Sequence, residues 1–295
     1  SMALSRGAGR SRPPRIAQRL GRIALLAVWA TVAAAHGPTV SAQPAASTTA
    51  QTTAGPKVLR LAFASRENNL DPAQISDVVS VAIVSSLFDA PLAYDHLARP
   101  ARLRPNTAVA LPEVSDNHTR FVFQLRPGIL FPDHPAFGGQ PRELVAADYV
   151  YSIKRYYDPA TRSPTLFHYE NAGLLGLGEL RRRAIETKTP FDYDAPVEGV
   201  RVLDRYRFEI RTARPAPRLP FVLASPVLAG AQAREVVAID PTTIGERPVG
   251  TGPYRLADWK RGTRVVLERN AHQGWRTYDA EPNADDTAGQ ALAAR

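Results

Sequence analysis

Three short segments of this 295-residue sequence contain residue types that could do chemistry. Residues 250–252 (GTG) offer a flexible backbone that could wrap a phosphate. Residues 133–134 (DH) offer two metal-binding side chains, and residues 192–194 (DYD) hold two carboxylates that could act as an acid–base pair. Each of these chemistries needs further groups at a defined spacing, so the surrounding residues decide whether the segment can perform it.

The glycines of residues 250–252 do not match a phosphate-binding loop. A dinucleotide-binding loop needs a third glycine and must open a helix, so that the phosphate meets free backbone N–H groups. Here Pro253 follows at once and a strand pattern continues. The segment therefore predicts a tight turn that enters a strand.

The histidines and carboxylates do not form a metal site or a catalytic group either. The six histidines lie far apart, with no pair at helical spacing, and the two prolines beside residues 133–134 predict a surface loop. Residues 192–194 lie in a polar, proline-flanked run typical of a solvated surface, and no serine stands in a Gly-x-Ser-x-Gly turn. The sequence predicts no catalytic residue, no metal, no cofactor and no enzyme activity.

Aromatic residues are concentrated between positions 130 and 170. Core packing is the first interpretation of such a cluster. The alternative is that one or two rings line a ligand cleft, since rings give a large contact area at low entropic cost. The aromatic side chains concerned are Phe131, Phe137, Tyr149, Tyr151, Tyr156, Tyr157, Phe167 and Tyr169.

Composition and charge exclude two further classes of protein. The chain has no cysteine, which removes disulfides, thiolate metal sites and cysteine nucleophiles. Its net charge is +9, but six arginines and no acidic residue lie before position 43, and without them the net charge is +3. The remaining chain lacks the basic surface of a nucleic-acid-binding protein, so no nucleic-acid partner is expected.

The first 42 residues have the pattern of an export signal. An arginine-rich stretch precedes an apolar run of about 13 residues at positions 23–35, which is shorter than the roughly 20 residues of a membrane-spanning helix. Small residues at 40–42 provide a cleavage site. We expect residues 1–42 to be a cleaved signal peptide, residues 43–56 to be a flexible leader, and the mature protein to be periplasmic. Without a cysteine to acylate, a lipid anchor is not expected.

Periodicity predicts a mixture of strands and helices after this leader. Alternating apolar residues predict strands at 57–64 and 121–125 and two hairpins, at 197–212 and 254–269. Asp71-Pro72 has the form of a helix start, followed by apolar residues at helical spacing up to Leu87. A second amphipathic helix is expected at 145–157, and the sequence from 278 onward is polar and weakly patterned.

Several of these segments together resemble the periplasmic oligopeptide- and dipeptide-binding proteins of ABC importers, which form family 5 of the bacterial extracellular solute-binding proteins. Order and spacing are similar from residue 57 to about 275. The segments are 70–72 (LDP), 87–95 (LFDAPLAYD), 121–131 (FVFQLRPGILF), 146–155 (AADYVYSIKR), 202–206 (VLDRY), 248–254 (PVGTGPY) and 265–270 (VVLERN).

The resemblance implies an α/β fold of the type II periplasmic-binding class, in which two lobes close on a ligand. This chain would form the first lobe from residues 57–88 and 205–278, with an inserted α+β subdomain at 89–204 and a polar tail at 279–295. Family members continue beyond the LERN segment into a second lobe that this chain lacks. The resemblance therefore implies an isolated first lobe with an unpaired sheet edge, and weak or absent binding, because one wall recovers only part of the binding free energy.

The implied function is the capture of peptides, as a monomer, for delivery to an inner-membrane ABC permease. In relatives the loop after the first strand contacts the backbone of the ligand, which here means Ser65, Arg66, Glu67 and Asn68. The resemblance also points to Ala224 and Ser225, near the hinge and cleft, and to Tyr169 in the inserted subdomain.

Other functions remain open at this stage. The same fold carries relatives that bind nickel, haem, opines or sugars. A lobe kept as a sensor or interaction module, without transport, is a further alternative and would be active as this chain alone. A secreted hydrolase would need a clustered acid–base group that the sequence does not show.

Overall fold

The structure is a computed structural model that describes residues 57–239, 244–277 and 280–294. Residues 60–295 form one compact unit. The predicted signal peptide (1–42) and leader (43–56) lie outside the described residues.

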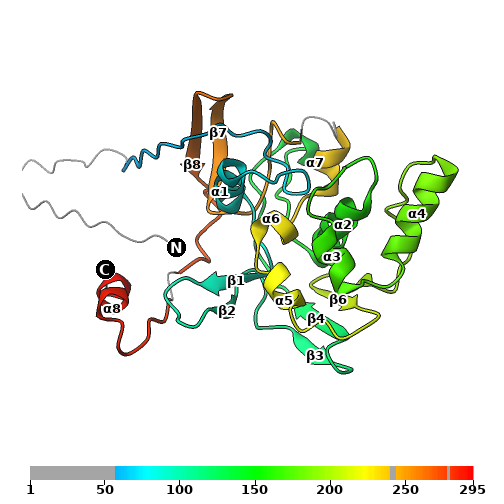
Figure 1. Ribbon diagram of the computed structural model, residues 1–295. Helices are drawn as coiled ribbons and strands as arrows, with labels where there is room; N and C mark the ends of the chain where they lie inside the picture. The colour runs from blue at the N-terminus through cyan, green and yellow to red at the C-terminus, as the bar shows by residue number, and fades with distance from the viewer. Residues whose placement is uncertain (1–56, 240–243, 278–279, 295) are drawn as a thin grey trace, which may run out of the picture. The chain divides into compact units, whose positions relative to one another are not determined.

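Groups of helices and groups of strands follow one another along the chain (Figure 1). The helices are α1 (Val78–Leu87), η1 (Pro135–Phe137), α2 (Ala146–Tyr157), α3 (Phe167–Ala172), α4 (Leu177–Thr187), α5 (Leu219–Val222), α6 (Pro226–Ala229), α7 (Arg234–Ile239) and α8 (Thr287–Ala293). The strands are β1 (Leu92–Asp95), β2 (Arg102–Pro105), β3 (Glu113–Ser115), β4 (Arg120–Gln124), β5 (Val200–Asp204), β6 (Arg207–Arg211), β7 (Tyr254–Lys260) and β8 (Arg264–Arg269).

Within the described residues, the strands form three antiparallel sheets. Four strands pair in the order β3-β4-β6-β5, while β1 pairs with β2 and β7 pairs with β8. The predicted strand at 121–125, the helix at 145–157 and both hairpins are confirmed as β4, α2, β5–β6 and β7–β8. The division at residue 204, which stays a prediction, falls between β5 and β6 of one hairpin.

The main core lies between the four-stranded sheet and helix α2. Phe123 of β4 stacks on Phe208 of β6, with ring centroids 4.9 Å apart, and Tyr149 of α2 stacks on Phe208 at 5.4 Å. All three rings are almost fully buried. Because β4 and α2 both present their apolar face to this stack, alternation in the strand and helical spacing in α2 lead to the same core.

A second core joins α1 to the β7–β8 hairpin. Val79, Ile83 and Leu87 of α1 are buried in it, and Leu256 and Trp259 of β7 pack against it. Helix α1 is rich in β-branched residues, whose intrinsic helix propensity is modest. This packing therefore contributes most of what stabilises α1.

The predicted strand at 57–64 is wrong. These residues are extended but form no strand, and Leu61 and Phe63 are 69% and 47% exposed. No strand within the described residues pairs with them, and a lone strand leaves its N–H and C=O groups without partners. Alternating apolar residues indicate that a segment can form a strand, but they do not show that another strand lies beside it.

The predicted helix start at Asp71 is also wrong, because α1 begins at Val78. Its N-cap is Asp77, whose Oδ1 accepts a hydrogen bond from the backbone N–H of Ser80 at 2.8 Å. Asp71 lies in an isolated turn, where its Oδ1 accepts the backbone N–H of Ala73. Both aspartates satisfy the sequence rule for a cap, and only the packing of the following residues distinguishes them.

Replacement of Asp77 by alanine is expected to lower the free energy of unfolding by about 1 kcal/mol, because α1 loses its side-chain cap. Urea unfolding followed by circular dichroism would measure the loss. Asp77→Ser, which keeps a capping oxygen, should remain close to wild type. Equal stability of the alanine variant and the wild type would show that the cap does not contribute.

Candidate ligand-binding site

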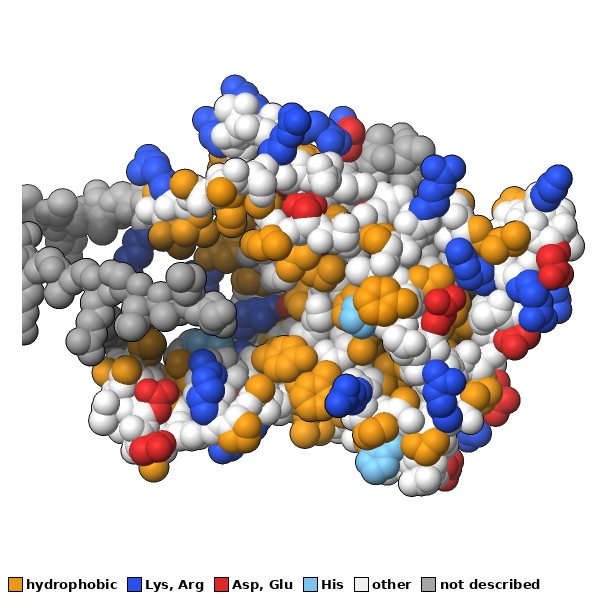
Figure 2. Space-filling model, in the orientation of Figure 1, with side chains coloured by type: hydrophobic (Ala, Val, Ile, Leu, Met, Phe, Trp, Pro, Cys, Tyr) orange, Lys and Arg blue, Asp and Glu red, His pale blue; other side chains and the backbone are white. Residues whose placement is uncertain are grey.

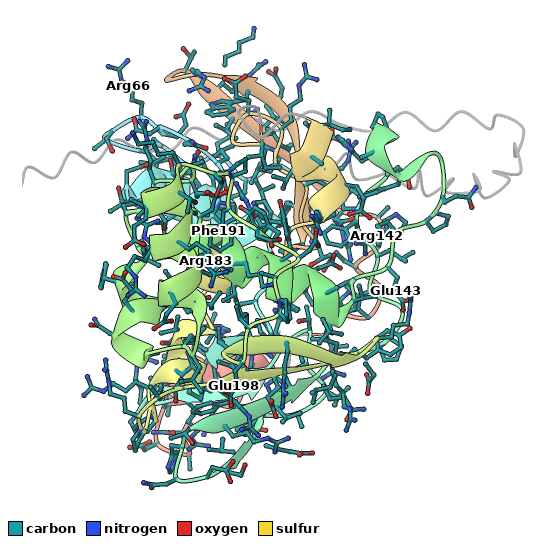
Figure 3. The ribbon with its side chains drawn as sticks, turned by 90° about the vertical axis from the view of Figure 1, so that its right-hand side faces the viewer. Arg66, Arg142, Glu143, Arg183, Phe191 and Glu198 are labelled. Atoms are coloured by element: carbon teal, nitrogen blue, oxygen red, sulfur yellow. The ribbon has the colours of Figure 1, made fainter. Side chains whose placement is uncertain are left out.

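The predicted ligand loop, residues 65–68, presents three side chains to solvent and one to the protein. Ser65, Arg66 and Asn68 are exposed, whereas Glu67 is 9% exposed. Figure 3 shows Arg66 beside the tip of the β7–β8 hairpin. The Glu67 carboxylate accepts a hydrogen bond from the indole Nε1–H of Trp259 at 2.5 Å.

Glu67 is held as a carboxylate by these surroundings. Burial raises the pKa of Glu67, but the hydrogen bonds from Trp259 and Gly262 and the charge of Arg261 outweigh burial and lower the pKa below its ordinary value. Glu67 is almost buried, and its Oε1 accepts both hydrogen bonds, so the carboxylate is turned toward the hairpin and away from solvent.

An open hollow of about 490 Å³ lies against strand β7. Residues 132–134, 246–250 and 254–259 line it, together with Leu87 and Arg261. The lining combines apolar side chains with guanidinium and carboxylate groups of both signs. Figure 2 shows Lys and Arg side chains gathered over the β7–β8 hairpin. A surface with both charges can accept a zwitterionic chain, whereas it offers no concentrated field for a polyanion.

The two polar segments considered for metal or acid–base chemistry have structural partners. His134 lines the hollow, and its Nδ1 accepts the backbone N–H of Ala136 at 3.2 Å. Burial, and then the charge of Arg247, lowers the pKa of His134. Asp194 forms an ion pair with Arg234 on the surface. No group of three or more His, Cys, Asp or Glu residues that could hold a metal occurs in the part of the chain that the structure describes.

The glycines of residues 250–252 allow two segments to cross at backbone distance. A Cβ on Gly250 would lie 2.3 Å from the carbonyl oxygen of Leu87, and one on Gly252 would lie 2.4 Å from the carbonyl carbon of Leu87. The backbone N–H of Gly252 donates to that same oxygen at 2.9 Å. The turn thus docks the end of α1 on the start of β7, which accounts for its glycines without a phosphate.

The remaining predicted site residues lie in or near the core. Tyr169 is fully buried, and its hydroxyl donates to the carbonyl oxygen of Leu228 at 2.5 Å. Ala224 is 4% exposed, and Ser225 is half-buried at the start of α6. Among the described residues, no hydrogen bond or ion pair joins either place to the loop at 65–68. The core interpretation is thus confirmed for Tyr169.

A buried ion pair that the sequence does not reveal supports this region. The guanidinium of Arg155 in α2 donates two hydrogen bonds to the carboxylate of Asp71, at 2.8 and 2.9 Å. Gln232 donates to the same carboxylate at 3.1 Å and accepts from Arg155. Arg155 is among the buried residues of α2, and a charged side chain is buried only with a partner. The sequence does not identify that partner.

A second buried carboxylate, that of Asp89, anchors the segment that follows β8. Arg276 donates to Asp89 at 2.6 Å, and Thr251 and Asn106 donate to the same carboxylate. Burial raises the pKa of Asp89, against the opposing effect of Arg276, Asn106 and Thr251. This network fixes the segment after β8 to the residues that follow α1.

Comparison with known proteins identifies the family. The family model described as "Bacterial extracellular solute-binding proteins, family 5 Middle" matches residues 102–287, which is more than half of the chain. This chain belongs to family 5 of the bacterial extracellular solute-binding proteins. It is 28% identical over 207 residues to the periplasmic oligopeptide-binding protein OppA of Salmonella typhimurium, a match that covers 70% of this chain and 34% of OppA.

Solved structures of other binding proteins have a similar fold. The Haemophilus influenzae OppA complex with the peptide RPPGFSPFR matches with a TM-score of 0.57 and 22% identity, over 70% of this chain and 37% of that one. MoaA of A. tumefaciens R10 in complex with mannopinic acid matches with a TM-score of 0.56 and 20% identity, over 72% and 36%. The predicted type II periplasmic-binding fold is confirmed, and the chain spans about a third of the length of its relatives.

Among the described residues, no helix combines the length and the apolar character that a membrane crossing requires.

Proposed function

We propose that this chain is part of a periplasmic protein that binds peptides and delivers them to an inner-membrane ABC permease. The observation that carries the proposal is its similarity in sequence to OppA, which is named as an oligopeptide-binding protein. The proposed location is the periplasm, reached through the signal peptide at residues 1–42, and the proposed form is a monomer.

We propose different parts for the predicted site residues, according to how exposed each side chain is. Ser65, Arg66 and Asn68 carry the proposed contacts to the ligand, because their side chains are exposed. Ser225 is half-buried and can reach a ligand only along its exposed side. Tyr169 and Ala224 would act by packing, since almost none of their surface is open. An extended peptide bound mainly through its main chain would suit a site with few side-chain pockets.

The proposed domain division follows the family. Residues 57–88 and 205–278 would form the first lobe, residues 89–204 the inserted subdomain, and residues 279–295 would lead toward the second lobe. Because a closing wall opposite the loop would share the binding free energy, we expect affinity in the millimolar range for this chain alone.

An opine ligand is the alternative that a specific observation favours. The MoaA structure of the same fold is a complex with mannopinic acid. Nickel, haem or sugar ligands, or a role as a sensor or interaction module, have no such support here. A peptide and an opine both carry a carboxylate and an amine, so the mixed charges of the hollow suit either one.

Thermal unfolding of the full chain with a mixed di- to pentapeptide pool tests the proposal. At about 10 mM pool and a dissociation constant of about 1 mM, binding stabilises the folded state by about 1.4 kcal/mol. The midpoint should therefore rise by about 3–6 °C for a domain of this size. The same concentration of free amino acids serves as the control.

The outcomes separate the two ligand classes. A rise with the peptide pool alone supports peptide binding, and a rise with mannopinic acid alone supports the opine alternative. An unchanged midpoint with the peptide pool would contradict the expected millimolar affinity of this chain alone.

A further inference from the structure

Glu67 differs from its neighbours in the predicted ligand loop because one oxygen of its carboxylate accepts two hydrogen bonds from the β7–β8 hairpin. One carboxylate oxygen, Oε1, accepts the indole N–H of Trp259 at 2.5 Å and the backbone N–H of Gly262 at 2.8 Å. Both donors belong to the hairpin, about 190 residues further along the chain. Hydrogen bonds to a charged acceptor are among the stronger ones in proteins, and a glutamate that makes two of them has one preferred position.

The turn between β7 and β8 also holds the loop through its next residue, Asn68. The guanidinium of Arg261 donates to the backbone carbonyl of Asn68 at 3.1 Å and to the carboxylate of Glu246 at 2.7 Å. The same guanidinium lies 4.5 Å from the ring centroid of Trp259. Arg261 and Trp259 therefore stabilise each other through a cation–π contact, and each also forms a hydrogen bond to the loop.

The far end of the loop is fixed by two other elements. The backbone N–H of Asn68 donates to the hydroxyl of Ser80 in α1 at 3.1 Å, and that of Leu70 donates to the carbonyl of Gly245 at 3.0 Å. Gly245 lies so close to Asn69 that an added Cβ would overlap its side-chain oxygen. Three elements thus meet the loop on its inner side, and Ser65 and Arg66 remain exposed.

We propose that Glu67 is a positioning residue, which holds the loop at 65–68 on the β7–β8 turn through Trp259 and Gly262 and does not itself contact the ligand. This inference rests on the proposed function, because it assigns the ligand contacts to Ser65, Arg66 and Asn68. It also revises the part that the family resemblance implies for Glu67. The hydrogen-bonding geometry of Trp259 becomes a direct report of whether the loop is in place.

The first measurement uses the indole N–H signal of Trp259 in the proton–nitrogen NMR spectrum of the full chain, assigned by its absence in Trp259→Phe. In Glu67→Ala the exchange of this proton with solvent should become at least about tenfold faster, because its acceptor is lost. Glu67→Gln keeps an accepting oxygen and should change the rate by less than about threefold. The indole proton of Trp275 is the internal control.

The second measurement asks how Glu67 affects peptide binding. Glu67→Ala and Trp259→Phe should both weaken binding about tenfold, which reduces the midpoint rise caused by about 10 mM of the peptide pool to about a third. A direct contact predicts a different result, because Trp259→Phe leaves the Glu67 carboxylate present and would preserve the rise. Arg261→Ala tests the second hold on the loop and should weaken binding in the same direction.

The two measurements distinguish failure of this inference from failure of the proposed function. Unchanged exchange of the Trp259 indole proton in Glu67→Ala overturns the inference whatever the ligand. Loss of the midpoint rise in Glu67→Ala but not in Trp259→Phe overturns it as well. If the wild-type chain shows no rise with the peptide pool, the expected peptide binding by this chain alone fails, while the exchange rates still decide whether Glu67 holds the loop.

Discussion

Replacement of Asp71 by alanine is expected to lower the free energy of unfolding by about 3–5 kcal/mol, because it leaves a buried guanidinium without its counter-charge. The side chain of Asp71 is 0% exposed and that of Arg155 is 4% exposed. Burial lowers the pKa of Arg155, but the charge and hydrogen bonds of Asp71 together have the larger effect and raise the pKa above its ordinary value. The arginine therefore stays charged at any pH where the protein folds. Urea unfolding of the full chain measures the loss.

Two controls show whether the loss comes from the uncompensated charge. The double variant Asp71→Leu with Arg155→Met should recover most of the stability, because an apolar pair carries no desolvation cost. Glu186→Ala breaks a pair with Arg182 in which both side chains are 66% exposed, and should change stability by less than about 0.5 kcal/mol. A double variant as unstable as Asp71→Ala would show that lost packing, and not charge, is responsible.

The ion pair between Asp71 and Arg155 gives a structural role to two of the segments that resemble the family. Asp71 belongs to the LDP segment and Arg155 ends the YSIKR segment, 84 residues later. Gln232 of the loop before α7 completes the contact. These segments are structural: they join the turn before α1, helix α2 and the loop after α6 at one buried point.

Local patterns predicted the elements that make their own partners. Helix α2 and the β5–β6 and β7–β8 hairpins form from neighbouring residues, so alternation and helical spacing were sufficient. The prediction of a strand at 57–64 was wrong because a strand needs a partner from another part of the chain. The predicted start of the first helix lies six residues before the observed one, because Asp71 pairs with Arg155 and does not cap α1. Pattern alone contains no information about such distant partners.

The candidate site was less accessible to sequence reasoning than the fold. The resemblance located the loop at 65–68, but it could not show that Glu67 turns inward toward Trp259, nearly two hundred residues away. The resemblance also pointed to Tyr169 as a site residue, but the Tyr169 hydroxyl donates to the carbonyl oxygen of Leu228 in the core. Orientation of a side chain depends on donors that the fold brings together, and spacing along the sequence does not encode it.

Substitution of Gly252 by alanine is expected to destabilise the protein by about 3 kcal/mol or more, because the new methyl group meets backbone atoms that cannot move aside. The added Cβ would lie 2.4 Å from the carbonyl carbon of Leu87 and 2.7 Å from the backbone nitrogen of Phe88. The crossing is also held on its other side, since Asn270 donates to the carbonyl of Gly252 at 3.0 Å. The segment therefore cannot retreat without losing hydrogen bonds.

Gly274→Ala is the matched control for this substitution. A Cβ at Gly274 meets nothing within 4 Å, so stability should change by less than about 0.5 kcal/mol. Differential scanning calorimetry of the two variants separates the effect of the crossing from the general effect of replacing a glycine in a loop. If both variants unfolded at the wild-type temperature, the close approach of residues 250–252 to the end of α1 would be incorrect. If only Gly252→Ala is destabilised, the close packing of the GTG turn against the end of α1 is sufficient to explain the glycine at position 252.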